Sequence, residues 1–300
     1  MKEIIKEEIE QKGIPFEKHG RQLVWHDEFE SPELDREKWG FDRSMGGKDR
    51  IYDNGPEQFR IEDGKVHMIT RLSGDAEKPF ILPEALATNR TMVFKHGYVE
   101  MCGRLPFRHG AWPSFWMQSA TPFSKAGYFS EIDILEGYSS PNQIGSTLHK
   151  WGNGKHSGLD VENKIIVDNW KYTFKNPENL NNEYHVYGFE WDENFARFYV
   201  DDEMYASYPI DEEHDFDKVV LPGMQGLHDF SYLLFNNEIF SRGGGWPVNG
   251  WNIQVGEEMP IHYYIDYVRL YQKDGEEIKY GPEIAEAIEK NGGRQFVYGE

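Results

Sequence analysis

The chain has a single cysteine, few basic residues and no long apolar run. Cys102 has no second cysteine to pair with, so an intramolecular disulfide is excluded. Lys and Arg total 32 against 52 Asp and Glu, a formal net charge of −20, which makes nucleic acid and anionic membranes poor partners. No apolar segment approaches the roughly 18 residues of a membrane span. A neutral polysaccharide, by contrast, would not be repelled.

The first residues also lack the features of a secretion signal. Residues 1–8 are too charged to form the apolar core of a signal peptide. We therefore expect either a cytoplasmic protein or a secreted one whose signal was removed before this numbering begins. We also expect a monomer.

Aromatic side chains and short alternating segments are abundant. Phe, Trp and Tyr make up 15% of the residues, which suits both a sandwich core and a surface that stacks against sugar rings. Residues 65–70, 97–102 and 195–200 alternate between apolar and polar positions and are separated by Gly, Pro, Asn and Asp, a pattern that predicts an all-β sandwich. Asp201-Asp202 then predicts a hairpin turn.

Helical spacing occurs at the two ends of the chain. Ile4, Ile5 and Ile9 predict a short helix that ends before Gly13. Near the C-terminus, Pro282 suits a first helical turn, and the face of this second helix would carry Ile284, Ala285 and Ile288. We therefore divide the chain into a helical extension (residues 1–20), one β domain (21–273) and a tail with a short helix (274–300).

The segment at residues 130–136 carries three acids among branched aliphatic residues. Strand alternation places Glu131 and Asp133 on one face, whereas Glu136, five positions after Glu131, would turn to the other. A one-residue β-bulge near Ile134-Leu135 would return all three carboxylates to one face, and such bulges are frequent beside active sites.

Carboxylates grouped in this way can carry out glycoside hydrolysis, which uses a pair of carboxyl groups. In a retaining enzyme one carboxylate attacks the anomeric carbon while a protonated acid, roughly 5 to 5.5 Å away, gives a proton to the leaving oxygen. Alternation of acids and aliphatic residues also describes an ordinary solvated strand face, so this short segment alone leaves both interpretations open.

At these residues the sequence resembles glycoside hydrolase family 16, whose active-site strand reads Glu-x-Asp-x-x-Glu. The resemblance implies that Glu131 is the nucleophile, Asp133 a helper and Glu136 the general acid/base. It extends from residue 21 to about residue 272 and includes a segment similar to the family's Gly-x-Trp-Pro-x-x-Trp motif at residues 110–116. It implies a concanavalin A-like β-jelly-roll sandwich whose concave sheet forms an open cleft for a polysaccharide.

The resemblance also implies residues that contact the substrate. Each of them could instead fill the core or anchor a loop. The candidates that rest on the resemblance are Trp112, as the sugar-stacking residue, Trp116 and His149. Trp151 is a further candidate, and Asn236, Glu238 and Trp246 are added because their strand leads into a flexible glycine loop.

No cofactor is expected for the chemistry, but family members often carry one structural calcium away from the cleft. The matching positions are Glu28, the backbone carbonyl of Gly64, and Asp266. Oxygen ligands of this kind suit Ca²⁺. Alternatively, Glu28 and Asp266 form salt bridges.

The expected substrate is a β-glucan with β-1,3 or mixed linkages, cut internally. Ser130, where the laminarinase branch commonly has Gly, leaves an endo-β-galactanase of the agarase, porphyranase or carrageenase type open. For an anionic galactan, the loop at residues 46–50, together with Arg90, Arg104 and Arg108, would supply positive charge; alternatively, these scattered arginines are ordinary surface charges. A transglycosylase and a non-catalytic carbohydrate-binding lectin are further alternatives.

Overall fold

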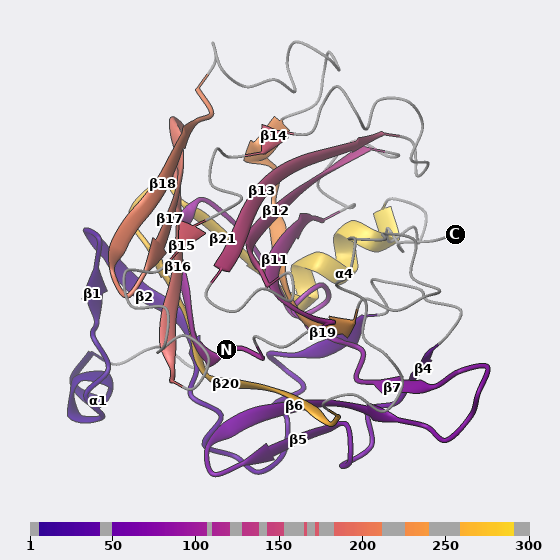
Figure 1. Cartoon of the computed structure of the whole chain (residues 1–300). Helices are drawn as coiled ribbons and strands as arrows, with labels where there is room; N and C mark the ends of the chain where they lie inside the picture. The colour runs from indigo at the N-terminus through magenta and orange to yellow at the C-terminus, as the bar shows by residue number, and fades with distance from the viewer. Residues whose placement is uncertain are drawn as a thin grey trace.

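Two β-sheets packed face to face make up the fold (Figure 1). The computed structural model describes residues 6–42, 50–106, 110–120, 128–137, 143–152, 165–166, 172–173, 183–211, 226–239 and 259–290. Within these ranges the structure confirms the predicted sandwich with short terminal helices.

The first sheet has 11 strands in the described ranges and runs in the order β18-β17-β16-β10-β20-β6-β7-β4, with β1, β2 and β5 attached at its sides. Its strands are β1 (Glu17–Lys18), β2 (Arg21–Asp27), β4 (Arg50–Tyr52), β5 (Phe59–Glu62), β6 (Lys65–Leu72), β7 (Phe80–Leu82), β10 (Gly97–Arg104), β16 (His185–Trp191), β17 (Phe195–Val200), β18 (Glu203–Pro209) and β20 (Ile261–Gln272). Asp201 and Asp202, both with positive φ, form the predicted turn between β17 and β18.

The second sheet has ten described strands in the order β14-β13-β12-β11-β19-β8-β3, with β15, β9 and β21 attached. Its strands are β3 (Gly40–Asp42), β8 (Ala85–Ala87), β9 (Met92–Lys95), β11 (Ala111–Ser119), β12 (Tyr128–Glu136), β13 (Gln143–Gly152), β14 (Ile165–Ile166), β15 (Tyr172–Thr173), β19 (Ser231–Ile239) and β21 (Glu277–Tyr280). The acidic segment lies in β12, between β11 and β13 (Figure 1).

The main core fills the space between the sheets. Strand alternation explains its make-up, because every second side chain of a strand turns inward. In β11 these inward residues are Phe115 and Met117, and in β20 they include Tyr263 and Ile265; all four are fully buried in one cluster. The opposite face of the second sheet, which we call its outer face, therefore carries the other half of each strand.

Helix α4 (Gly281–Lys290) lies on part of that outer face, beside β11 and β19 in Figure 1. Ile284, only 1% exposed, packs in a second cluster with Trp116, Tyr232 and Leu234. Ala285, which we expected on the same helical face, is exposed.

The other terminal segment packs on the first sheet. Ile9 of α1 (Lys6–Gln11) joins Ile14, Tyr98 and Tyr271 in a separate cluster. A short 3-10 helix, η2 (Gly226–His228), precedes β19. In the described part of the chain, no helix is long and apolar enough to cross a membrane.

The packing of α4 generates a stability prediction. Ile284→Ala should lower the free energy of unfolding by about 2 kcal/mol or more, because it leaves a cavity beneath the helix. Urea denaturation would measure the loss. Glu289→Ala, an exposed change on the same helix, is the control and should alter stability by less than about 0.5 kcal/mol. Equal values for the two variants would show that α4 contributes no buried contact.

A second prediction concerns pH. Burial, helped by the nearby His228 ring, lowers the pKa of His96 to about 3. The unfolded chain, with a His pKa near 6.5, therefore binds a proton first as the pH falls, and the folded state loses stability below about pH 6.5. Between pH 7 and pH 5 this group should cost about 2 kcal/mol. Urea denaturation of the parent protein and His96→Gln at both pH values would test this, and an unchanged drop in the variant would contradict it.

Candidate active site

Strand β12 contains one extra residue at the predicted position. Along β11, Ser114 pairs with Glu136 and Phe115 with Leu135, but the next residue, Trp116, pairs with Asp133. The partner strand on the other side, β13, shows the same shift between Asp133 and Glu136. The predicted β-bulge is therefore confirmed, with Ile134 as the residue that has no partner in the β11 ladder.

The bulge places the three carboxylates on one face. Residues directly opposite each other in an antiparallel pair project to the same side of the sheet. Glu131 lies opposite Gln118, Asp133 opposite Trp116, and Glu136 opposite Ser114. The partners are all even-numbered residues of β11, which face away from the main core, so Glu131, Asp133 and Glu136 share the outer face of the second sheet.

Contacts around the bulge hold it in place. The Ser146 hydroxyl donates a hydrogen bond of 2.7 Å to the carbonyl of Ile134 and also contacts the Tyr205 hydroxyl. This satisfies a buried carbonyl at the irregular point of the ladder. Just after the strand, the backbone N–H of Gly137 donates to the Pro113 carbonyl at 2.9 Å. A Cβ at Gly137 would lie 2.8 Å from the Pro113 ring, so only glycine allows this approach.

The outer face is well protected around the acids. Asp133 is 3% exposed and Glu136 8% exposed, whereas Glu131 is half-buried. The Trp112 indole N–H donates a hydrogen bond of 2.8 Å to Oε1 of Glu136 and so restrains that carboxylate. Trp112, the predicted stacking residue, is itself half-buried.

Trp116 and Asn236 are joined to each other rather than open to a ligand. The Trp116 indole N–H donates to Oδ1 of Asn236 at 3.0 Å, and both side chains are buried. Trp116, 6% exposed, belongs to the cluster beneath α4. Both residues therefore lie on the same sheet face as the carboxylates. Their side chains are buried and bonded to each other, and Trp116 is packed beneath α4.

Glu238 is the acceptor in a buried ion pair. Its carboxylate contacts the Arg50 guanidinium and accepts a hydrogen bond of 2.7 Å from the Tyr52 hydroxyl. Burial raises the pKa of Glu238, and Arg50 opposes the rise. Arg50 is thus occupied by Glu238, while Arg104 lies on the first sheet over the Tyr264 ring. The structure does not support the expectation that these two arginines supply charge for an anionic galactan.

Three predicted contact residues fall outside what the structure describes. The backbone of β13 pairs His149 with Glu131 and Trp151 with Phe129, but the side chains of His149 and Trp151 lie outside the described residues. Trp246 lies outside them entirely.

Two residues that sequence analysis missed lie on the same face. Gln118 is opposite Glu131 on β11, and Tyr232 is opposite Gln118 on β19. The parity that selected Trp112 and Trp116 also selects Gln118, and could have found it.

The calcium expectation is not supported by the contacts of its residues. Glu28 accepts hydrogen bonds of 3.0 and 2.8 Å from Arg269, and Asp266 lies 3.0 Å from the Lys65 ammonium. Burial alone would raise the pKa of Glu28, but hydrogen bonds from His26 and Arg269 outweigh burial and hold this pKa below its ordinary value. A basic side chain already pairs with each carboxylate. The described residues contain no group of three or more His, Cys, Asp or Glu suited to a metal. Gly64 simply lies in the turn between β5 and β6, with positive φ.

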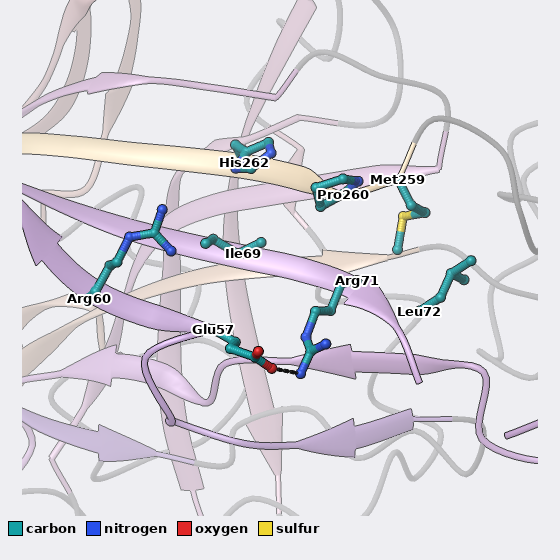
Figure 2. A pocket seen from close by; sticks show the side chains of 8 residues that line it. All are labelled: Glu57, Arg60, Ile69, Arg71, Leu72, Met259, Pro260 and His262. Atoms are coloured by element: carbon teal, nitrogen blue, oxygen red, sulfur yellow. Dashed lines mark hydrogen bonds and ion pairs between the residues drawn. The ribbon is translucent and has the colours of Figure 1, made fainter. Parts of the chain in front are cut away.

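A groove of about 540 Å³ lies on the first sheet, away from the carboxylates (Figure 2). Its basic groups are already engaged, because Arg71 pairs with Glu57, as Figure 2 shows, and Arg60 donates to Glu62 at 2.8 Å. The groove is lined by Glu57, Arg60, Ile69, Arg71, Leu72, Met259, Pro260 and His262. None of these is a predicted site residue.

Comparison with known proteins agrees with the motifs. The family model for glycosyl hydrolases family 16 matches residues 82–225. A glucan endo-1,3-β-glucosidase of Cryptopygus antarcticus is 30% identical over 198 residues, covering 61% of this chain and 67% of that protein. The chain belongs to glycoside hydrolase family 16. The resemblance seen in the sequence, and the prediction of a glycoside hydrolase at the level of the family, are confirmed.

Another curated relative and a solved structure extend the likeness. A β-glucanase of Rhodothermus marinus is 29% identical and covers 84% of this chain and 85% of its own length. The crystal structure of SCLam, a non-specific endo-β-1,3(4)-glucanase, superposes with a TM-score of 0.65 at 25% identity over 85% of this chain and 92% of its own. This likeness confirms the jelly-roll prediction. The chain spans only 38% and 34% of the length of two longer curated relatives.

The bulge contacts generate a prediction for Ser146. Ser146→Ala should lower the free energy of unfolding by about 1 to 2 kcal/mol, because the buried Ile134 carbonyl loses a donor. The change should also lower turnover, since Glu136 follows the bulge. Ser207→Ala, an exposed serine of β18, is the matched control for urea denaturation. A stable variant with full activity would show that Ser146 does not hold the bulge.

Proposed function

We propose that the chain is a retaining, endo-acting glycoside hydrolase that cleaves internal β-1,3 or mixed β-1,3-1,4 linkages of a glucan. The observation that carries the proposal is the bulge in β12, which gives Glu131, Asp133 and Glu136 a common face. Family membership supports the chemistry, and the printed names of the relatives described above support a glucan over a galactan.

The roles follow from the positions of the three acids. Glu131 is the nucleophile: one of its oxygens bonds to the anomeric carbon as the glycosidic bond breaks, and Glu136 gives its proton to the leaving oxygen. Glu136 then takes a proton from water, the water oxygen bonds to the anomeric carbon, and the Glu131 carboxylate is released. Two displacements at one carbon retain the configuration.

Neighbouring groups adapt the acids to these roles. Asp133 lies between the two glutamates on the same face, and repulsion among like charges favours keeping one proton within the group. The Trp112 indole N–H fixes Glu136 from the side of β11. We further propose that the Trp112 ring stacks on a sugar, and that His149 and Trp151, from the strand opposite Glu131, contact the same glycan.

The nucleophile assignment is tested by Glu131→Gln. This variant should lose at least about 10³-fold in kcat while remaining folded, because an amide cannot form the glycosyl intermediate. Reducing-end release from a linear β-1,3-glucan, a mixed-linkage β-glucan and a β-galactan would be measured. The control is Glu193→Gln, at an exposed position in the turn between β16 and β17, which should behave as the parent protein.

Two outcomes would contradict the proposal. Unchanged turnover in Glu131→Gln would remove the nucleophile. Sugar released first as the inverted anomer, or only from the galactan, would remove the retaining mechanism or the glucan specificity.

A further inference from the structure

Gln118 has a buried side-chain amide that is satisfied at one end only. Its Oε1 accepts a hydrogen bond of 3.0 Å from the Tyr232 hydroxyl. Its Nε2 has no hydrogen-bond partner among the residues the structure describes, although the side chain is only 2% exposed. A buried donor without an acceptor costs about 1 to 3 kcal/mol, a cost that a hydrogen bond to a neighbouring carboxylate would remove.

The unsatisfied donor lies beside Glu131. Gln118 and Glu131 are direct partners across β11 and β12, an arrangement that brings Cβ atoms to about 4.5–5.5 Å of each other on one face. Tyr232, the partner of Gln118 on the other side, is near enough to Glu131 to respond to its charge. Burial first, and then the charges of Asp42 and Glu131, raise the pKa of Tyr232 well above its ordinary value.

Electrostatics selects one orientation of the amide. A neutral phenol can donate to Oε1 or accept from Nε2, so Tyr232 alone would permit either. A carboxylate on the adjacent strand repels Oε1 and attracts the N–H groups. The orientation seen, with Oε1 on Tyr232, is the one that leaves both N–H groups for Glu131.

We propose that Gln118 is a positioning residue for the nucleophile: its Nε2, which has no partner among the described residues, turns to donate a hydrogen bond to the Glu131 carboxylate when that group is ionised, and the Tyr232 hydroxyl holds the amide in the required orientation. The inference rests on the proposed function. Because the bond favours the ionised carboxylate, it supports the attacking form of Glu131. Since Gln118 is buried, it does not itself reach the sugar.

The burial of Tyr232 ties this arrangement to α4. Tyr232 is packed in the cluster that contains Ile284, and this contact excludes water from the phenol and from the amide beneath it. The C-terminal helix thereby supports the nucleophile through two intermediate side chains.

The test is the pH dependence of kcat and kcat/KM in Gln118→Met, which keeps the length of the side chain and removes the N–H groups. We expect kcat to fall about tenfold, KM to stay within about twofold, and the acidic limb of the kcat/KM profile to move upward by about one pH unit. Tyr232→Phe, which is isosteric, should move both quantities in the same direction by a smaller amount. It keeps the proposal testable if Gln118→Met does not fold.

The matched control is Tyr263→Phe, a fully buried tyrosine of the first sheet that also has no hydroxyl partner among the described residues. Its pH profile should equal that of the parent protein. An unshifted acidic limb in both Gln118→Met and Tyr232→Phe, or an effect confined to KM, would overturn the proposal. These outcomes are distinct from failure of the proposed function, which would appear as a lack of turnover in the parent protein or full turnover in Glu131→Gln.

Discussion

One extra residue in β12 is the constraint on which the site depends. In a regular strand Glu136 would share the inward face of Ile132 and Ile134 and enter the packing between the sheets. Burying an ionised carboxylate there would cost far more than a hydrogen bond returns. The bulge at Ile134 avoids this cost, and the Ser146 and Tyr205 hydroxyls both donate to the Ile134 carbonyl at the irregularity. The same bulge lets one short segment contribute both side chains that the reaction needs.

The strand next to β12, β11, is packed on both of its faces. Inward residues such as Phe115 and Met117 fix β11 against the first sheet. On the outer face, α4 packs over Trp116 and Tyr232. β21 pairs with β9 and so continues the second sheet directly into α4. The division between domain and tail at residue 273 stays a prediction, but the helix that follows packs on the same sheet face as the carboxylates.

Local sequence rules predicted the features that depend on neighbouring residues. Parity located the bulge, because Glu131 and Glu136 could not otherwise share a face. Alternation identified the sandwich, and Asp201-Asp202 marked its turn. Contacts between distant parts of the chain had no such signal: Arg50 and Glu238 are 188 positions apart, and Glu28 and Arg269 are 241 apart. The sequence analysis therefore counted Arg50 as available to a ligand and left a metal and a salt bridge both open for Glu28, whereas folding pairs each of them with an opposite charge.

These distant pairs matter for the charge of the site. The chain carries a formal net charge of −20, and the outer face already groups three acids within one strand. A fourth negative charge at Glu238, on the strand next but one, would raise the cost of ionising Glu131. Arg50 and Tyr52 compensate Glu238 within the buried layer. Opposite Glu131 on β11, the neutral amide of Gln118 provides hydrogen-bond donors without adding charge. The pairing of Glu238 with Arg50 thus removes one charge that would otherwise oppose an ionised Glu131 beside a protonated Glu136.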